Sequence, residues 1–214
     1  MRTMEQLVAT APDATDLQIL ATARREFSTK GFHGANMDVI ALEAGVGKGT
    51  VYRRFHNKEQ LFFSLLEWTF NGFIQFLETP ERPGTFRERV ERHMRRARRF
   101  VKENLDLIRL LAHERSRISE ACGSDELLDW ARHFHRTMYR FWIRISREAA
   151  AAGELRTGED PELVGTVLGF MAHAVYGDMI LSEGAFTDRD FRRREDVFLR
   201  SIEDGLFVQG GHDA

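Results

Sequence analysis

Hydrophobic residues near the start of the chain recur at the three- and four-residue spacing of an amphipathic helix. The first such stripe consists of Leu20, Ala23 and Phe27. Thr15 or Asp16 can cap this helix, and Lys30-Gly31 provides a basic last turn followed by a terminating glycine. The pattern predicts a helix from about residue 16 to residue 30.

Three further helices follow, each marked by residues that cap helices. Asn36 can cap a short helix that ends at Gly45, and another short helix is expected over 48–55. Asn57, with a glutamine three residues later, resembles a capping box that opens a fourth helix.

Beyond residue 80 the helical stripes become longer, and no strand-like alternation of useful length appears. Caps at Asp160 and Thr187 open the last two helices. The apolar spacings predict helices over about 86–101, 105–117, 124–153, 161–181 and 188–206. The expected fold class is therefore all-α, with a small N-terminal three-helix domain followed by a larger helical domain.

Composition narrows the class of protein. The chain of 214 residues is 43% hydrophobic and 30% charged, with a net charge of −2, typical of a soluble globular protein. It has one cysteine, which excludes an intramolecular disulfide, and no stretch of signal-peptide type at its start, so we expect a cytoplasmic protein without membrane association. The apolar stretch 163–181 carries His173, Asp178 and several glycines, which favours a buried helix over a membrane span.

Basic charge is concentrated in one short segment of the N-terminal domain. Seven basic and five acidic residues lie between Asp16 and Phe62, and four of the seven basic ones fall within 48–58. The slightly negative net charge argues against general coating of nucleic acid, and the focused basic charge is compatible with a local binding site.

Residues 37–55, MDVIALEAGVGKGTVYRRF, have the pattern of a helix-turn-helix. Two short helices meet at Gly45, which can adopt the positive φ of a tight turn. A small apolar core is expected from Ile40, Ala41, Val46 and Val51. On the second helix Val51 and Phe55 face inward, which leaves exposed a set suited to a DNA major groove: Lys48, Thr50, Tyr52, Arg53 and Arg54.

The longer run 31–62, GFHGANMDVIALEAGVGKGTVYRRFHNKEQLF, closely resembles the signature of the TetR family of transcriptional regulators. The close resemblance covers residues 16–62, and the remaining chain matches in length and helical layout. It implies a flexible arm over 1–15, a DNA-binding domain over 16–57, a ligand-binding and dimerisation domain over 58–209 and a tail over 210–214.

The resemblance also implies roles for single residues. Lys48 and Gly49 stand where the recognition helix approaches base edges, and a lysine can donate to guanine. Positions that grip phosphate or reach bases are matched by Thr50, Tyr52, Arg53, Arg54 and Lys58, while Asn36 can both cap its helix and touch phosphate. Gly47 replaces the family's common serine, so a phosphate contact is expected to be missing there. For any one of these residues alone, packing or a solvated helix face is the simpler interpretation, and for Asn36 capping is an equal alternative.

Large side chains are frequent in the second domain, and the resemblance implies that some line a cavity for a small-molecule effector. The candidate ligand-binding residues are His93, Phe100, His113, Trp130, Phe134, Met138, Phe141 and His173. For each histidine, a packed side chain without a ligand remains the alternative. No catalytic motif, phosphate loop or metal-ligand spacing occurs, so we expect no enzyme activity, no metal and no cofactor.

Small residues on the expected helix after Asp160 allow another helix to approach closely. They are Gly165, Gly169 and Ala172. In the family the last two helices form a dimer bundle, which implies a homodimer through about 160–183 and 188–207, while tight packing within one chain is the alternative. A dimer also fits DNA recognition, because one short helix supplies little specificity.

The resulting hypothesis is a regulator that binds a near-palindromic double-stranded operator and is released by a small apolar or amphipathic effector. A constitutive repressor, an activator without inducer, and a helical small-molecule-binding protein remain open alternatives.

Overall fold

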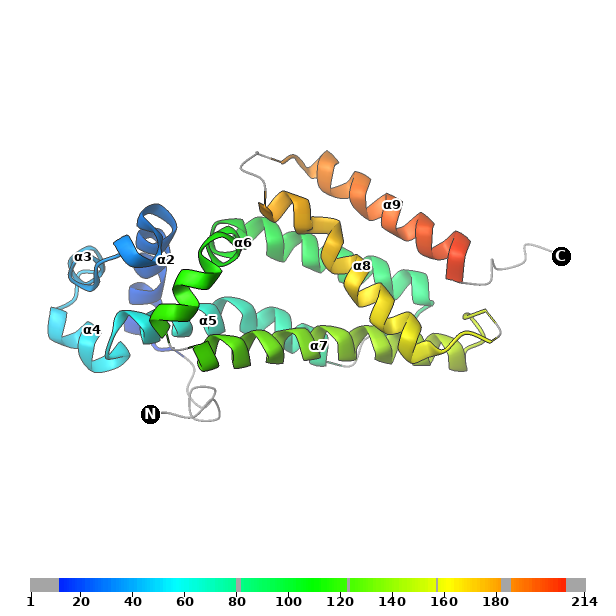
Figure 1. Ribbon diagram of the computed structural model, residues 1–214, viewed down its shortest axis with the longest axis horizontal. Coiled ribbons are helices and arrows are strands. Elements are labelled where there is room, and N and C mark those ends of the chain that lie inside the picture. The colour runs from blue at the N-terminus through cyan, green and yellow to red at the C-terminus, as the bar shows by residue number, and fades with distance from the viewer. Residues whose placement is uncertain (1–11, 80–81, 123, 157, 182–185, 207–214) are drawn as a thin grey trace. The chain divides into compact units, whose positions relative to one another are not determined.

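The chain is helical through most of the residues that the structure describes. The computed structural model describes residues 12–79, 82–122, 124–156, 158–181 and 186–206. Its helices are α2 (Ala14–Gly34), α3 (Met37–Glu43), α4 (Lys48–Phe55), α5 (Lys58–Glu78), α6 (Phe86–Cys122), α7 (Ser124–Ala151), α8 (Pro161–Leu181) and α9 (Asp188–Leu206) (Figure 1). The all-α prediction is confirmed. Of the arm expected over 1–15, residues 1–11 lie outside the described residues and residues 14–15 belong to α2. The expected tail 210–214 also lies outside the described residues.

The cap of α2 differs from the sequence-based expectation. Asp13 is the capping residue, because its side chain accepts a hydrogen bond from the Asp16 N–H at 2.9 Å. Asp16 is the third helical residue and accepts a bond from the Asp13 N–H in return, which forms a capping box. The predicted cap at Thr15 or Asp16 is therefore wrong. Gly31 has a φ of 71°, so the regular helix is broken at the predicted glycine although helical turns continue to Gly34.

Four other predicted caps are confirmed by side-chain bonds to the backbone. Each accepts a hydrogen bond from an N–H two or three residues later, at 2.8–3.4 Å. The capping residues are Asn36, Asn57, Asp160 and Thr187. These local signals set the starts of α3, α5, α8 and α9.

The two helices expected over 86–101 and 105–117 are one element, α6, with a kink at its middle. Asn104 has φ −127° and ψ 18°, outside the helical range. Its side chain donates a hydrogen bond to the Phe100 carbonyl at 2.9 Å, which satisfies a backbone acceptor close to the kink. The sequence located the interruption but not the continuity of the helix through it.

The described residues group into two compact units. The first contains the chain up to Gly72 and Asp106–Asp129, and the second contains Phe73–Leu105 and the chain from Trp130. Helices α5, α6 and α7 each contribute to both units. The predicted boundary between residues 57 and 58 stays a prediction.

In the second unit, the small residues of α8 pack against α7 of the same chain. A Cβ at Gly165 would lie 2.5 Å from the Ile143 Cα and 2.7 Å from its backbone nitrogen. At Gly169 a Cβ would lie 3.1 Å from side-chain carbons of Trp142 and Tyr139. The intramolecular alternative considered for this stripe therefore holds, and the stripe does not itself argue for a dimer.

A buried polar network ties α6, α8 and α9 together in the second unit. The Tyr176 hydroxyl donates to Glu195 Oε1 at 2.7 Å and lies 3.3 Å from the Met94 carbonyl oxygen. Arg98 forms an ion pair with the other carboxylate oxygen of Glu195. Burial raises the pKa of Glu195, while the bond from Tyr176 and the charge of Arg98 act in the opposite direction. The network fixes the register of α9 on its neighbours.

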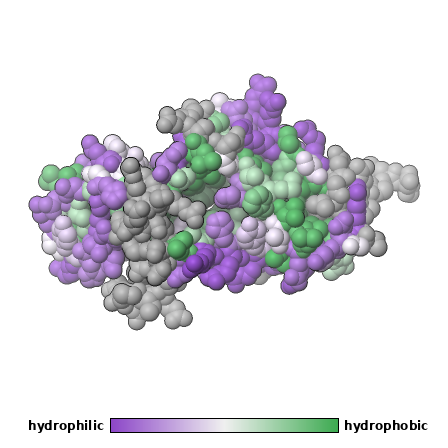
Figure 2. All heavy atoms as spheres, viewed as in Figure 1, coloured by the Kyte–Doolittle hydropathy of each residue, from purple (hydrophilic) through white to green (hydrophobic). Residues whose placement is uncertain are grey.

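Helix α8 has a second apolar face that the described chain leaves uncovered. Leu163 and Phe170 are 62% and 69% exposed, and Val167 and Leu181 are exposed on the same side. Figure 2 shows hydrophobic side chains gathered along α8 on the face in view. The helix is long and apolar enough to cross a membrane, with 41% of its most apolar window buried, but the core helix of a soluble protein passes the same test.

Candidate nucleic-acid interface

The turn between α3 and α4 is built by backbone hydrogen bonds around Gly45. Gly45 has a φ of 63°, its N–H donates to the Leu42 carbonyl at 3.1 Å, and the Val46 N–H donates to the Ala41 carbonyl at 3.0 Å. This pair of bonds is the Schellman arrangement, which requires the left-handed conformation that glycine adopts without strain. The turn ends α3 and redirects the chain into α4, and α3 packs against both α4 and α2 (Figure 1).

The core beneath the turn is apolar, as predicted. Ile40, Ala41, Val51 and Phe55 are buried, whereas Val46 is half-buried. Val51 and Phe55 are one helical turn apart, so they place the same face of α4 inward. The opposite face of α4 is consequently free to meet a ligand.

The exposed face of α4 carries most of the residues expected to bind DNA. Lys48, Gly49, Tyr52 and Arg53 are exposed, and Thr50 is half-buried. Gly49 and Arg53 lie one turn apart on the side opposite the buried pair. Gly47 caps the helix through its backbone alone, since no side-chain bond is made there. The expected absence of a hydroxyl contact at this position follows from the glycine itself.

The two other predicted residues with basic side chains in this region are held by the protein. Lys58 Nζ donates to the His33 carbonyl at 2.9 Å and lies 5.1 Å from the centre of the Phe32 ring. Arg54 Nη1 binds the carboxylates of Asp13 and Asp16 at 2.8 and 2.7 Å. Both side chains fasten segments of the domain to one another, which the sequence pattern did not indicate.

Lys48 and Asn36 are more exposed than Arg54 and Lys58 and make fewer bonds to the protein that would prevent a DNA contact. Lys48 Nζ pairs with Asp38 Oδ2 at 2.6 Å, and both side chains are well exposed. Asn36 is exposed, and its own N–H donates to Glu26 Oε1 at 3.3 Å. The exposed pair can exchange Asp38 for a phosphate at small cost, because solvent-exposed ion pairs contribute little. Asn36 acts as a cap, and its DNA contact stays a prediction.

The helices of the DNA-binding domain are joined to α6 by a contact that local sequence patterns do not reveal. Arg24 on α2 donates to both oxygens of Asp106, at 2.9 and 2.5 Å, and the Ser28 hydroxyl donates to Oδ2 at 2.9 Å. Partial burial raises the pKa of Asp106, but these bonds outweigh it and leave the value below the ordinary range. Asp106 follows the Asn104 kink by two residues, so α6 contacts the DNA-binding helices directly after its bend.

In the second unit, five of the predicted effector-binding residues belong to one aromatic cluster. Phe100 stacks on Phe73 at 4.8 Å, and Phe73 lies 6.4 Å from Phe134, which stacks on Trp130 at 5.9 Å. Residue His93 is 1% exposed and stacks on Phe141 at 4.5 Å. The structure thus brings together His93, Phe100, Trp130, Phe134 and Phe141.

His93 is the polar centre of this cluster. Its ring also meets Trp142 edge-on at 4.8 Å, and its Nδ1 has no hydrogen-bond partner. Burial lowers the pKa of His93 from 6.5 to about 3, so the imidazole is neutral at physiological pH. A neutral imidazole offers one donor and one acceptor, which suits an uncharged polar group on a ligand.

The three other predicted ligand residues are less closely connected to the cluster. Met138 is half-buried on α7, and His113 is exposed and belongs to the first unit. His173 is exposed on α8, with its ring 5.8 Å from that of His135. Their role in ligand binding stays a prediction.

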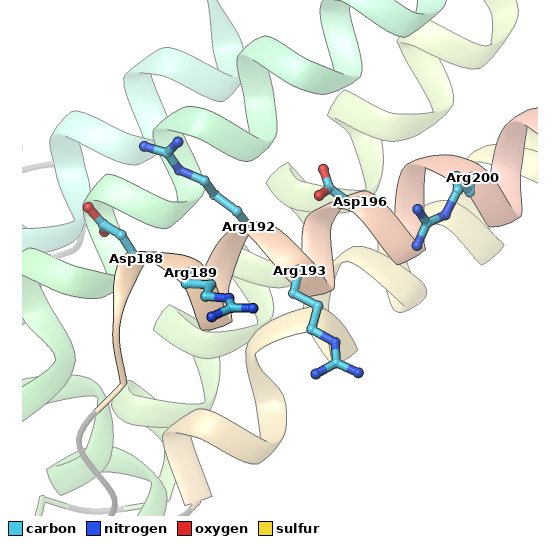
Figure 3. A pocket seen from close by; sticks show the side chains of 6 residues that line it. All are labelled: Asp188, Arg189, Arg192, Arg193, Asp196 and Arg200. Atoms are coloured by element: carbon cyan, nitrogen blue, oxygen red, sulfur yellow. The ribbon is translucent and has the colours of Figure 1, made fainter.

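A surface hollow of about 580 Å³ lies along α9 and is lined by polar side chains only. The lining residues are Asp188, Arg189, Arg192, Arg193, Asp196 and Arg200. Figure 3 shows that the arginine side chains diverge from the helix rather than converge on one point. The hollow therefore lacks the convergent polar groups of a ligand site.

Two short helices joined by a tight turn, with one face buried and the other polar, define a helix-turn-helix DNA-binding protein. Residues 19–65 match the family described as bacterial regulatory proteins, tetR family. This match, together with the relatives and the solved structure that follow, supports a DNA-binding transcriptional regulator of the TetR family.

Curated relatives agree with this assignment. The chain is 25% identical over 179 residues to the HTH-type transcriptional regulator UidR of Escherichia coli K12, covering 79% of this chain and 84% of that protein. Over 61 residues it is 41% identical to the HTH-type transcriptional repressor SCO4008 of Streptomyces coelicolor, covering 28% and 32%. These relatives are regulators, in keeping with the expectation that the chain is not an enzyme.

The fold is also that of a solved family member. The crystal structure of a TetR-family regulator from Mesorhizobium loti superposes with a TM-score of 0.68 at 23% identity, covering 91% of this chain and 97% of that one. The likeness extends over both the helix-turn-helix and the helical remainder.

Proposed function

We propose that this regulator is a dimeric repressor that binds a near-palindromic operator through α4 and is released by a small apolar or amphipathic effector. The observation that carries the DNA-binding part is the exposed polar face of α4, held in place by the buried pair Val51 and Phe55. The repressive sign is supported by a relative that is itself named as a repressor.

DNA binding is tested by selecting fragments from genomic DNA and measuring their affinity at several salt concentrations. Tyr52→Ala and Arg53→Gln should each weaken binding to the selected site at least tenfold, because base and phosphate contacts contribute about 1–3 kcal/mol each. Arg136→Gln removes the same charge as Arg53→Gln from an exposed position on α7 and serves as the matched control. Weak, sequence-independent binding that ignores both α4 substitutions would contradict the proposal.

The dimer is proposed to form through the exposed face of α8, where Leu163, Val167 and Phe170 lie, with a second copy as the occupant. The opposite face is already used against α7, so the apolar surface that remains on α8 is the one facing outward. The neighbouring helix α9 carries exposed arginines and Asp196, so it offers a second copy charges of both signs, as a self-complementary interface requires.

Light scattering after gel filtration measures the state of association. Phe170→Glu should convert the dimer to monomer, whereas Trp68→Glu, which alters an exposed aromatic residue on α5, should not. A wild-type monomer at micromolar concentration, or a dimer that survives Phe170→Glu, would exclude this face as the interface.

The effector is proposed to enter the aromatic cluster around His93. An unpartnered, buried Nδ1 among aromatic rings favours an uncharged aromatic molecule that carries a hydrogen-bond donor, such as a phenol. Release of labelled operator can be followed by fluorescence anisotropy with phenols, the matching unsubstituted arenes and fatty acids as probes. His93→Gln should change the response to phenols, while Arg136→Gln, at an exposed position on α7, should leave it intact. Operator binding that no tested compound alters would favour a constitutive regulator.

A further inference from the structure

Arg54 stands next to the most exposed arginine of α4 but is used differently. Its Nη1 lies 2.8 Å from Asp13 Oδ2 and 2.7 Å from Asp16 Oδ1, and its side chain is 29% exposed. Arg53 is exposed and lies on the side of α4 opposite Val51. Two neighbouring arginines of one helix therefore point to different surroundings.

Asp13 and Asp16 also hold the first turn of α2 together. Asp13 Oδ1 accepts from the Asp16 N–H at 2.9 Å, and Asp16 Oδ2 accepts from the Asp13 N–H at 3.3 Å. Each carboxylate thus uses one oxygen for the capping box and the other for Arg54. One guanidinium nitrogen joins the end of α4 to the beginning of α2, across 41 and 38 residues of sequence.

We propose that Arg54 is a positioning residue that sets the rotation of the recognition helix α4 through Asp13 and Asp16, and is not itself a DNA contact. This inference rests on the proposed DNA-binding function. The buried pair Val51 and Phe55 fixes one side of α4, and the bonds of Arg54 fix a flank of the same helix. Together they determine which way Gly49, Tyr52 and Arg53 point.

The charges support a structural role for the bonds from Arg54 to Asp13 and Asp16, a lock on the rotation of α4, rather than a contact of Arg54 with phosphate. The hydrogen bond from Arg54 lowers the pKa of Asp13, so this carboxylate stays ionised when DNA arrives. A phosphate that captured Arg54 would leave two carboxylates without their cation beside a polyanion. Exchange of Arg54 from Asp13 and Asp16 to DNA is therefore unfavourable, in contrast to the exchange of Lys48 from its single exposed partner.

The test compares Arg54→Gln with the double substitution Asp13→Asn/Asp16→Asn in the full-length protein. Asparagine caps helices as well as aspartate does, so the double variant removes charge while keeping an acceptor for each capping bond. Operator affinity and its salt dependence are measured on the selected DNA site, with far-UV circular dichroism and thermal melting as checks on folding. Arg53→Gln is the matched control, since it removes the same charge from the next position.

A lock predicts that both variants weaken operator binding, by about fivefold, the upper range for exposed ion pairs. The combined triple variant should be no weaker than Arg54→Gln alone, because all three side chains serve one arrangement. Arg53→Gln should instead add its full effect to that of the aspartate variants. Arg54→Lys, which keeps the charge and one nitrogen donor, should recover at least part of the loss, because a single nitrogen of Arg54 makes both bonds.

Direct contact of Arg54 with phosphate predicts the opposite sign for the aspartates. Removing two negative charges near DNA would then tighten binding, and Arg54→Gln would reduce the slope of log affinity against log salt by about 0.9 for each recognition helix. Either result overturns the lock while leaving operator binding established. A wild-type protein that selects no DNA site would instead refute the proposed function, and the lock with it.

Discussion

The close approach of α8 to α7 at Gly165 gives a direct test of the fold. In Gly165→Ala the new Cβ would lie 2.5 Å from the Ile143 Cα, 2.7 Å from the Ile143 nitrogen and 2.9 Å from the Trp142 carbonyl carbon. All three are backbone atoms inside α7, and Trp142 is fully buried, so α7 cannot retreat locally. Helix α8 must therefore move outward by roughly 1 Å to restore ordinary contact distances.

The cost of this movement can be set against the gain in helix propensity. Overpacking a well-packed core costs about 1–3 kcal/mol, and a clash with backbone belongs at the upper end of that range. Replacing glycine by alanine in a helix returns about 1 kcal/mol. The net loss in free energy of unfolding is then about 2 kcal/mol.

Gly72→Ala in α5 is the matched control, because it lies outside the face of α8 proposed as the dimer interface. A Cβ at Gly72 would meet no atom of a neighbouring segment within 4 Å, so this substitution should raise stability by about 0.5–1 kcal/mol. Urea denaturation at one fixed protein concentration, followed by circular dichroism, separates the two variants by the direction in which the midpoint shifts. A Gly165→Ala protein as stable as wild type would refute the close contact of α7 with α8.

Three further predictions concern single sites. In Gly49→Ala the new Cβ would meet nothing within 4 Å, so the substitution should raise stability by about 1 kcal/mol in thermal melting. If DNA approaches the backbone of Gly49, the same substitution should weaken operator binding in anisotropy titrations. Unchanged affinity would exclude that approach. Arg98→Leu should lower the free energy of unfolding by about 3 kcal/mol, because it leaves the buried Glu195 carboxylate without its ion-pair partner. Adding Glu195→Gln to the same chain should restore part of this stability in denaturation experiments. No restoration would argue against the ion pair. The pKa of His93 falls from 6.5 in the unfolded chain to about 3 in the folded protein. Between these two pH values only the unfolded chain binds a proton at His93. Stability should therefore fall by about 1.4 kcal/mol per pH unit as the pH decreases through this window. His93→Gln should remove that component of the pH dependence, and an unchanged slope would show that His93 titrates normally.

The features that sequence analysis predicted correctly depend on short stretches of chain. Asn36 caps α3, Gly45 takes the left-handed conformation, and α4 spans 48–55 as expected. Each depends on residues within about five positions, where capping and turn chemistry operate. The inward orientation of Val51 and Phe55 follows likewise from helical periodicity, so the exposed side of α4 was predictable.

The features that were missed depend on partners distant in sequence. Arg54 and the Asp13–Asp16 pair are about 40 residues apart, and Arg24 is 82 residues from Asp106. In the sequence, a basic residue that can bind a DNA phosphate looks the same as one that already forms an ion pair with a carboxylate of the protein. Only the fold distinguishes Arg53, which is exposed, from Arg54, which is engaged.

Helix α8 shows the same limit from the apolar side. Its sequence is nearly uniformly hydrophobic, so periodicity cannot separate a face that meets its own chain from one that meets another. The structure makes that separation, because Gly165 and Gly169 leave room only for α7, while Leu163 and Phe170 extend away from it. Small residues allow close approach, but large exposed ones supply the area that an association buries. The dimer hypothesis consequently depends on the side of α8 that carries Phe170, and not on the glycine stripe from which the sequence suggested it.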